Sequence, residues 1–235
     1  MKLSAPIYRL KHKAKRLSHD AKLPLHQALD RIAADEGFAA WSLLAAKASV
    51  AGPAERLYDW LKPGELLLLG ARPGQGKTLM GLRLAVQAAI EGSRAMFFTL
   101  EYTEQQVRDR LRQVGIGPSE EFLEIDCSDA ICTSYIRDKL AVAPSGTLVV
   151  IDYLQLLDQK REEPPLTDQV ETLRDLARRR GLIMVFISQI ARSYEISTKP
   201  FPDMADLRLP NPLDLTLFDK SCFLNNGSVR FSKAA

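Results

Sequence analysis

The stretch 70-GARPGQGKT-78 joins an apolar run, 65-ELLLLG-70, to a segment whose pattern predicts an apolar helix from Lys77 onward. A strand, a glycine-containing loop and a helix in this order place backbone N–H groups around a phosphate at a helix N-terminus. The usual phosphate-loop pattern has Gly where this chain has Ala71. The stretch predicts a nucleotide site, with an ordinary glycine-rich turn as the alternative.

The residue types within the loop suit the phosphates and metal of a nucleotide such as ATP. Lys77 is expected to reach the β- and γ-phosphates, and the Thr78 hydroxyl to hold Mg²⁺. Gly74 and Gly76 let the backbone approach a ligand closely. The residues expected to line the nucleotide are Arg72, Pro73, Gly74, Gln75, Gly76, Lys77, Thr78 and Leu79.

Alternating strands and helices are predicted from Glu65 onward. The apolar runs are 65-ELLLLG-70, 95-AMFFTL-100, 147-TLVVID-152 and 182-LIMVFIS-188. Continuous apolar strands of this kind are typical of a parallel sheet covered on both faces. Asn226-Gly227 between KSCFL and SVRFS predicts a final hairpin. The fold class is therefore α/β: a doubly wound, mostly parallel sheet with an antiparallel C-terminal hairpin.

The helices between these strands have clear start and stop signals. One runs from the phosphate loop to Glu91, a second opens with a capping box at Thr103 and Gln106, and a third begins near Thr167 or Asp168. The second helix places Val107, Leu111 and Val114 on one face. The three helices are expected to end at Gly92, Gly115 and Gly181.

A different, all-helical pattern occupies the first 50 residues. Three short amphipathic helices are expected there, and the Gly/Pro-containing stretch 51-AGPAERLYDWLKPGE-65 marks a boundary. The predicted organisation is a small basic helical domain (1–50), a linker (51–64) and the α/β domain (65–235).

Three polar residues follow the apolar strands at the predicted carboxyl edge. Asp152 ends its strand where a second Mg²⁺ contact is expected, the alternative being a carboxylate that caps a loop. Tyr153 stands next, so a water-activating base must come from elsewhere. Glu101 is the candidate base, although it could equally favour the dipole of the helix that Thr103 caps. Gln189 could sense the nucleotide or simply be a polar strand terminus.

These positions together resemble the ATPase domain of DnaB-type replicative helicases, a RecA-like class of P-loop ATPase. GARPGQGKT resembles that family's loop, in which Ala at position 71 is usual. Three further segments also resemble that family. Its catalytic glutamate lies in a segment like FFTLEYTEQQVRDRL, its Walker B aspartate in one like LVVIDYLQLL, and its sensor glutamine in one like ISQIAR. The resemblance covers about Tyr58 to Phe231. It implies ATP and Mg²⁺ as cofactors, with Glu101, Lys77 and Gln189 as catalytic residues and Thr78 and Asp152 as metal ligands.

The resemblance also implies single-stranded DNA as partner and a hexameric ring. Segment 193–208 resembles the family's DNA-facing loop, so Arg192, Lys199 and Arg208 are expected DNA contacts. The family's Lys-x-Arg-Asn-Gly supplies basic residues to a neighbour's γ-phosphate, but this chain reads 223-FLNNG-227. An arginine finger, a basic side chain that a neighbouring subunit places on the γ-phosphate, typically raises the hydrolysis rate by 10³–10⁵. Its absence here predicts slow hydrolysis and puts the ring in question. Whether Lys220 or Arg230 takes its place is left open.

Composition limits the remaining possibilities. The chain has 235 residues, 46% hydrophobic and 26% charged, with three cysteines in no metal-binding spacing. We expect a protein of the reducing cytoplasm without a membrane span. Net charge is only +3, but residues 1–22 contain seven Lys or Arg and a single acid, Asp20. That segment could bind DNA phosphates, be a solvated helix face, or dock another protein.

Two functions compete at this stage. The first is an ATP-hydrolysing, helicase-type ATPase that acts on single-stranded DNA. The second is a nucleotide-dependent DNA- or protein-binding regulatory module that has lost processive helicase activity. A recombination-mediator ATPase of the wider RecA class is a third reading, which the DnaB-like segments argue against.

Overall fold

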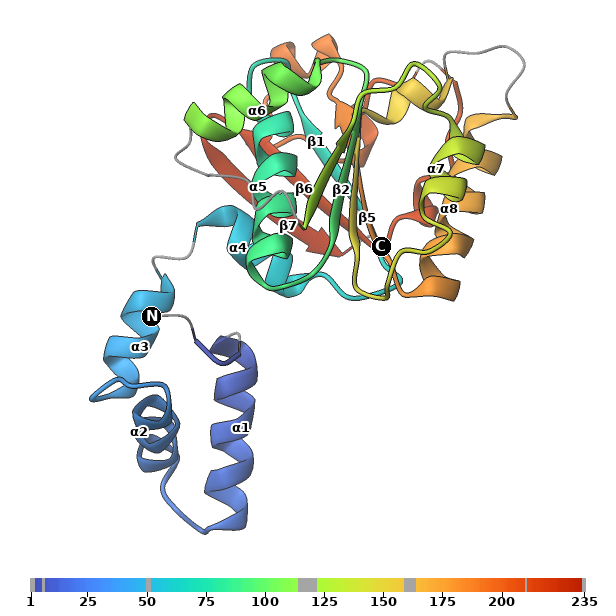
Figure 1. Ribbon diagram of the computed structural model, residues 1–235. Coiled ribbons are helices and arrows are strands. Elements are labelled where there is room, and N and C mark those ends of the chain that lie inside the picture. The colour runs from blue at the N-terminus through green and yellow to red at the C-terminus, as the bar shows by residue number, and fades with distance from the viewer. Residues whose placement is uncertain are drawn as a thin grey trace. The chain divides into compact units, whose positions relative to one another are not determined.

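The computed structural model describes residues 3–5, 7–49, 52–113, 122–158, 164–209 and 211–233. The chain divides into two compact units, 1–59 and 60–235 (Figure 1). The boundaries predicted above (1–50, 51–64 and 65–235) stay a prediction. None of the helices in the described ranges is long and apolar enough to cross a membrane.

The N-terminal unit is helical, as the sequence predicts. Its helices are α1 (Ile7–Asp20), α2 (Leu25–Asp35), α3 (Trp41–Ser49) and α4 (Pro53–Trp60), the last ending at the division between the units. Leu10 and Ala14 of α1 pack with Ile32 and Ala33 of α2 in one buried apolar cluster. Such spacing gives one apolar stripe per helix, which is what a small bundle needs to form a core.

Helix α4 lies within the stretch predicted as a linker. Pro53 is its first residue, a position where the missing N–H of proline is no disadvantage. Ala54 and Leu57 are buried. The stretch therefore reaches the second unit as a helix over Pro53–Trp60.

The second unit is built on a seven-stranded sheet in the order β3-β2-β4-β5-β1-β6-β7. All neighbouring strands are parallel except β6 and β7. This confirms the predicted α/β class. The elements are β1 (Leu66–Ala71), α5 (Lys77–Ile90), β2 (Ala95–Thr99), α6 (Glu104–Gln113), β3 (Leu123–Asp126), α7 (Thr133–Lys139), β4 (Leu148–Asp152), α8 (Leu166–Arg180), β5 (Ile183–Gln189), β6 (Lys220–Asn225) and β7 (Ser228–Lys233).

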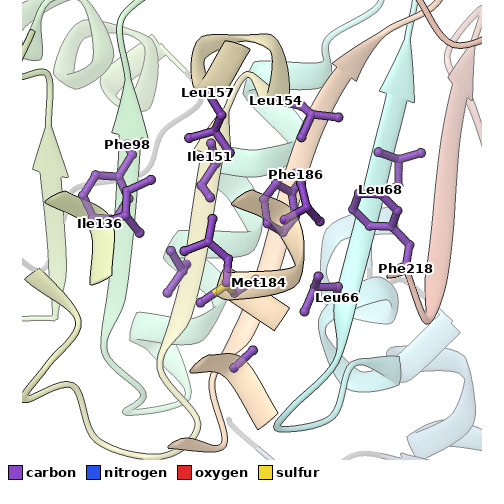
Figure 2. Close-up of a cluster of buried hydrophobic side chains, with 14 of the residues drawn as sticks. Leu66, Leu68, Phe98, Ile136, Ile151, Leu154, Leu157, Met184, Phe186 and Phe218 are labelled. Atoms are coloured by element: carbon purple, nitrogen blue, oxygen red, sulfur yellow. The ribbon is translucent and has the colours of Figure 1, made fainter. Parts of the chain in front are cut away.

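Helices cover both faces of the sheet, with α5 on one face and α7 and α8 on the other (Figure 1). Alternate residues of each central strand therefore enter different cores. Leu68, Phe98, Ile151 and Phe186 lie together in the cluster on the α7–α8 side (Figure 2). Their strands are buried at every position except Gln189 at the end of β5, which explains why they read as continuous apolar runs.

Most of the predicted helix and turn signals are confirmed. The reciprocal bonds of the capping box join the Thr103 N–H to Gln106 Oε1 at 2.9 Å and the Gln106 N–H to Thr103 Oγ1 at 3.4 Å. Helix α8 ends at Gly181, whose φ is 66°. Val114 and Gly115, predicted near the end of α6, lie outside the described residues. Strand β3 and helix α7 are additional elements that the sequence patterns did not identify.

The C-terminal hairpin is also confirmed. Asn226 and Gly227 have φ values of 48° and 75° between two antiparallel strands. Two successive positive φ angles match the right-handed twist of a tight hairpin, which is why Asn-Gly is favoured there.

The strand order brings four carboxyl ends together. In the sheet, Ala71 lies opposite Gln189, and Asp152 lies opposite both Thr99 and Ile187. The ends of β1, β5, β4 and β2 therefore form one continuous edge. Ligands of open α/β sheets bind at this edge.

Helix α5 packs tightly against the sheet at Gly81. A Cβ atom there would lie 2.7 Å from Ile187 Cδ1 and 3.1 Å from Val150 Cγ1. We expect Gly81→Ala to lower the free energy of unfolding, measured in urea, by about 1–3 kcal/mol, because overpacking forces neighbours from their preferred rotamers. The better helix propensity of alanine offsets at most about 1 kcal/mol of this.

The matched variant is Ile187→Val, which removes the Cδ1 atom in the way. Gly81→Ala and Ile187→Val together should destabilise less than the sum of the two single changes. Strict additivity would contradict this packing.

Candidate nucleotide-binding site

The phosphate-loop residues form a left-handed turn between β1 and α5. Gly74 and Gly76 have φ values of 77° and 83°, which glycine adopts without strain. A Cβ atom added to either would meet no described atom within 4 Å, so the space beside the loop is open to a ligand. Gly76 is the N-cap of α5, whose first N–H groups carry a partial positive charge. The loop has the geometry that a phosphate requires.

Lys77 and Glu101 meet at this loop. Lys77 Nζ lies 3.8 Å from Glu101 Oε2, and the lysine side chain is only 14% exposed. The Glu101 N–H donates to Thr99 Oγ1 at 3.1 Å, which fixes the backbone just after β2. The structure thus brings together the predicted phosphate lysine and the predicted base.

Asp152 is fully buried at the end of β4, and neither carboxylate oxygen has a hydrogen-bond partner of normal geometry among the described residues. Burial raises the pKa of Asp152 to about 6, and the negative charge of Glu101 adds to this. The nearby Thr78 hydroxyl and the Lys77 ammonium act in the opposite direction. Thr78 is itself buried. The two predicted metal ligands therefore lie close together, and the carboxylate lacks a counter-charge in contact with it.

Tyr102 and Arg110 belong to the same site, although sequence reasoning missed them. The Tyr102 hydroxyl donates to Glu101 Oε1 at 3.4 Å, and the Arg110 guanidinium lies 4.3 Å from the centre of the tyrosine ring. Burial raises the pKa of the Tyr102 phenol, and the Glu101 carboxylate raises it further. The positive charge of Arg110 also acts on Asp152. Arg110 lies on α6, eight residues beyond Tyr102, so only the turn and helix between them bring the two together.

Gln189 lies at the end of β5, and its side chain points to a different partner. Gln189 Oε1 accepts from Arg208 Nη1 at 3.2 Å, and the Arg208 N–H donates to the Gln189 carbonyl at 2.8 Å. The predicted sensor is thus joined to the end of the segment predicted to face DNA.

Two residues of the phosphate loop contact later parts of the chain. Arg72 donates to the Ala191 carbonyl at 3.1 Å and forms an ion pair with Glu195. Gln75 Oε1 accepts from the backbone N–H of Asn226 at 2.8 Å. The loop is therefore held by segment 191–195 and by the hairpin tip of its own chain.

Phe223 and Asn225, the positions at which the family has basic residues, have structural roles. Phe223 is buried, and its ring lies over Gly70, where a Cβ would come within 2.6 Å of Phe223 Cε1. Asn225 Nδ2 donates to the Pro200 carbonyl at 3.0 Å. Phe223 is thus part of the core, and the partly buried Asn225 side chain is neutral and bonded within its own chain.

Lys220 and Arg230, the two residues that could replace the missing finger, differ in their exposure. Lys220 is buried, pairs with Glu65, and lies 4.5 Å from the centre of the Trp60 ring. It starts β6 opposite Leu67, at the end of the sheet away from the phosphate loop. Arg230 is exposed on β7, with its guanidinium 5.7 Å from the Phe201 ring centre. Of the two, only Arg230 is accessible to another molecule.

The predicted DNA contacts are mostly engaged within the chain. Lys199 Nζ lies 2.9 Å from Asp203 Oδ2 and 3.1 Å from Asp206 Oδ2. Arg208 bonds to Gln189 as described, and Arg192 is exposed on a 3-10 helix, Arg192–Ile196. The role of the three cations in DNA binding stays a prediction.

Comparison with known proteins is consistent with this geometry. The model of the AAA_25 family, described as AAA domain, matches residues 33–207. A probable plasmid replicative DNA helicase of Chlamydia trachomatis serovar L2 is 26% identical over 181 residues, covering 63% of this chain and 40% of that protein. The replicative DNA helicase DnaB of Buchnera aphidicola subsp. Schizaphis graminum is 26% identical over 201 residues, covering 67% of this chain and 42% of that protein.

Among solved structures, a DnaB-like replicative helicase superimposes with a TM-score of 0.57 at 19% identity, covering 92% of this chain and 65% of that one. The chain spans less than half the length of the two curated relatives above. The resemblance to DnaB-type ATPase domains and the RecA-like fold class are confirmed. The chain belongs to the AAA_25 family of AAA domains, with the fold of a DnaB-type helicase ATPase domain.

Proposed function

We propose that this chain binds Mg²⁺ and ATP, hydrolyses ATP, and acts on single-stranded DNA as a helicase-type ATPase. The observation that carries the proposal is the buried carboxylate of Asp152 beside Thr78, without an ion pair among the described residues, next to a glycine loop that leaves room for phosphate. Burial raises the pKa of Asp152 despite the positive charges of Lys77 and Arg110, and a buried anion without a charge in contact is unfavourable, so the site is suited to a cation.

The available donors fit Mg²⁺ in particular. Within the described ranges, no group of three or more His, Cys, Asp or Glu side chains could hold a metal by itself. Mg²⁺ needs no such cage, because it binds one or two protein oxygens together with substrate phosphates and water. Asp152 and Thr78 would hold the ion, and when bound it would neutralise charge on the β- and γ-phosphates.

Glu101 would accept the proton of the attacking water. Its carboxylate pairs with Lys77. The γ-phosphate, more highly charged than a carboxylate, would compete for the lysine, leaving Glu101 free to orient water. Tyr102, which donates to the other carboxylate oxygen, would keep Glu101 in place.

Nucleotide and DNA would be coupled through the segment after β5. Arg72 in the phosphate loop holds Ala191 and Glu195, and Gln189 holds Arg208. A phosphate that displaced the contact of Arg72 would release the start of the segment that contains Arg192 and Lys199, and one that displaced the contact of Gln189 would release its end. We propose this segment as the contact for single-stranded DNA, in a cytoplasmic protein.

A second candidate function is a nucleotide-dependent regulatory module without processive helicase activity. The buried Phe223 and the internally bonded Asn225 favour it, because neither side chain carries the positive charge that a finger brings to a neighbour's phosphate. In that case the chain would work without the hexameric ring, and its N-terminal helices would dock a protein partner or nucleic acid.

The two candidates differ in assembly. In sedimentation velocity with Mg²⁺ and a non-hydrolysable ATP analogue, the regulatory module should remain a monomer. The reason is that Phe223 and Asn225, at the positions expected to contact a neighbouring subunit, make their contacts within their own chain. A hexamer whose ATP turnover drops after Arg230→Gln would favour the motor, with Arg230 as the finger.

Glu101→Gln tests the chemistry directly. We expect ATP turnover in the presence of single-stranded DNA to fall by about 10²–10⁴-fold, the usual contribution of a general base. Binding of a fluorescent ATP analogue should persist, because the amide retains the shape of the carboxylate. Glu104→Gln, which only loses an exposed pair with Arg108 on α6, is the matched control and should keep wild-type turnover.

Two results would contradict hydrolysis with Glu101 as the base. One is wild-type turnover in Glu101→Gln. The other is tight analogue binding with background turnover in every form, which would leave the regulatory module.

Asp152 makes stability depend on pH in a predictable direction. Because its pKa is raised from 3.8 to about 6 in the fold, the folded chain holds this proton more tightly than the unfolded chain. The resulting destabilisation is present above pH 6 and disappears as pH falls toward 4. Asp152→Asn lacks it, so the variant's advantage in free energy of unfolding should grow by about 2 kcal/mol from pH 4.5 to 7.5.

Saturating Mg²⁺ and ATP serves as the control for this measurement. The bound cation should abolish the wild-type penalty and reverse the ranking of the two proteins at pH 7.5. An equal gap at both pH values without ligand would contradict a raised pKa of Asp152 in the folded chain.

A further inference from the structure

Positive charge is concentrated in the N-terminal unit. Residues 1–59 contain ten Lys or Arg and six Asp or Glu, whereas residues 60–235 contain twenty-two and twenty-three. The unit with the nucleotide site is therefore slightly acidic, and the net charge of +3 comes from the other unit. All three histidines, His12, His19 and His26, are also in the N-terminal unit.

Within that unit, several exposed basic side chains lie on one face of α1. Leu10 and Ala14 are buried against the other helices of the unit. On the opposite side of the helix, Lys11, Lys15 and Arg16 are exposed, as are His12 and His19. These five positions fall within about 140° of one another at 100° per residue, so they form a single stripe along the helix. We call them the basic stripe.

The basic stripe has almost no compensation from acids. Among the described residues, Lys11, Lys15 and Arg16 have no ion-pair partner, while His19 contacts the neighbouring Asp20. Lys11 and Lys15 are four residues apart, the spacing at which like charges destabilise a helix. The stripe is therefore unfavourable for the isolated helix, and a polyanion would relieve the repulsion.

The segment after β5 offers much less free charge. Residues 191–208 contain three basic and three acidic side chains, so the segment is neutral. Lys199 is held by Asp203 and Asp206, and Arg208 by Gln189. Affinity for nucleic acid comes mainly from cations that neutralise phosphates. Of the two candidate surfaces, α1 has more cations available for this.

The chemistry of α1 favours nucleic acid over a membrane surface. A helix that binds in the plane of a bilayer must bury an apolar face in it. The apolar face of α1 is already occupied by the core of its own unit. The exposed side of α1 is a row of cations, and such a row can neutralise a regularly spaced line of phosphates.

We propose that the basic stripe of α1 binds the phosphate backbone of DNA, independently of sequence, as a second DNA contact beyond the segment after β5. It tethers the chain to its substrate through a surface that takes no part in ATP hydrolysis. The N-terminal unit is thereby a nucleic-acid-binding module, rather than a simple appendage of the ATPase.

The test compares two triple variants of the full chain that lose the same charge. One is Lys11→Gln, Lys15→Gln and Arg16→Gln in the stripe. The other is Arg83→Gln, Arg179→Gln and Lys233→Gln, all exposed positions of the second unit. Binding to fluorescent single-stranded and duplex oligonucleotides is measured by anisotropy from 50 to 200 mM salt, without nucleotide. Circular dichroism confirms that each variant is folded.

The stripe variant should bind at least about tenfold more weakly at 50 mM salt, and its slope of log affinity against log salt should shrink by about 2 for single strands and about 3 for duplex. The second-unit variant should keep the wild-type affinity and slope. Whichever oligonucleotide responds to the stripe identifies the form of DNA that it contacts.

ATP turnover without DNA separates this proposal from the function of the nucleotide site, because it should be unchanged in the stripe variant. Equal affinity and slope in wild type and stripe variant would overturn the proposal, even if ATP turnover were normal. Failure of the wild type to bind either oligonucleotide at 50 mM salt would also overturn it. If the wild type bound DNA through the basic stripe but did not hydrolyse ATP, the result would refute only ATP hydrolysis and would leave this proposal standing.

Discussion

The burial of one carboxylate, Asp152, is the constraint on which the nucleotide site depends. Helices cover both faces of the central strands, so these strands have no room for charge except at their ends. Asp152 stands at such an end, fully buried and without a hydrogen-bond partner of normal geometry among the described residues. Its raised pKa measures how unfavourable that position is for an anion alone. A bound cation would turn this local instability into affinity for Mg²⁺ and nucleotide.

Much of this arrangement could be predicted from sequence because its signals are local. Four strands appear as continuous apolar runs, and the hairpin is announced by Asn226-Gly227. The carboxyl edge follows from parallel topology, so Lys77, Glu101 and Asp152 were expected to meet. Strand β3 was missed because it is four residues long and only partly buried. Pro53 and Gly52 suggested a boundary, although proline also suits the first residue of α4.

Other features could not be predicted because they depend on contacts between distant segments. Arg110 enters the site only through the path of the turn and helix that follow Glu101. The pairing of Lys199 with Asp203 and Asp206 depends on the fold of a segment with little regular structure. The sequence shows that 223-FLNNG-227 lacks the expected basic residues, but it does not show what Phe223 does instead. The structure uses Phe223 to fill the space over Gly70, which makes the departure part of the core of this chain.

The two units divide the physical tasks between them. The second unit supplies the buried carboxylate and the phosphate loop, while the N-terminal unit carries the net positive charge. The central claim is that the Asp152 carboxylate binds Mg²⁺ together with the nucleotide. Calorimetric titration of the wild type with a non-hydrolysable ATP analogue at pH 7.5 tests this claim most directly. We predict binding at least about tenfold tighter with Mg²⁺ than with EDTA, a difference of about 1.4 kcal/mol. Equal affinity in the two conditions would contradict the account.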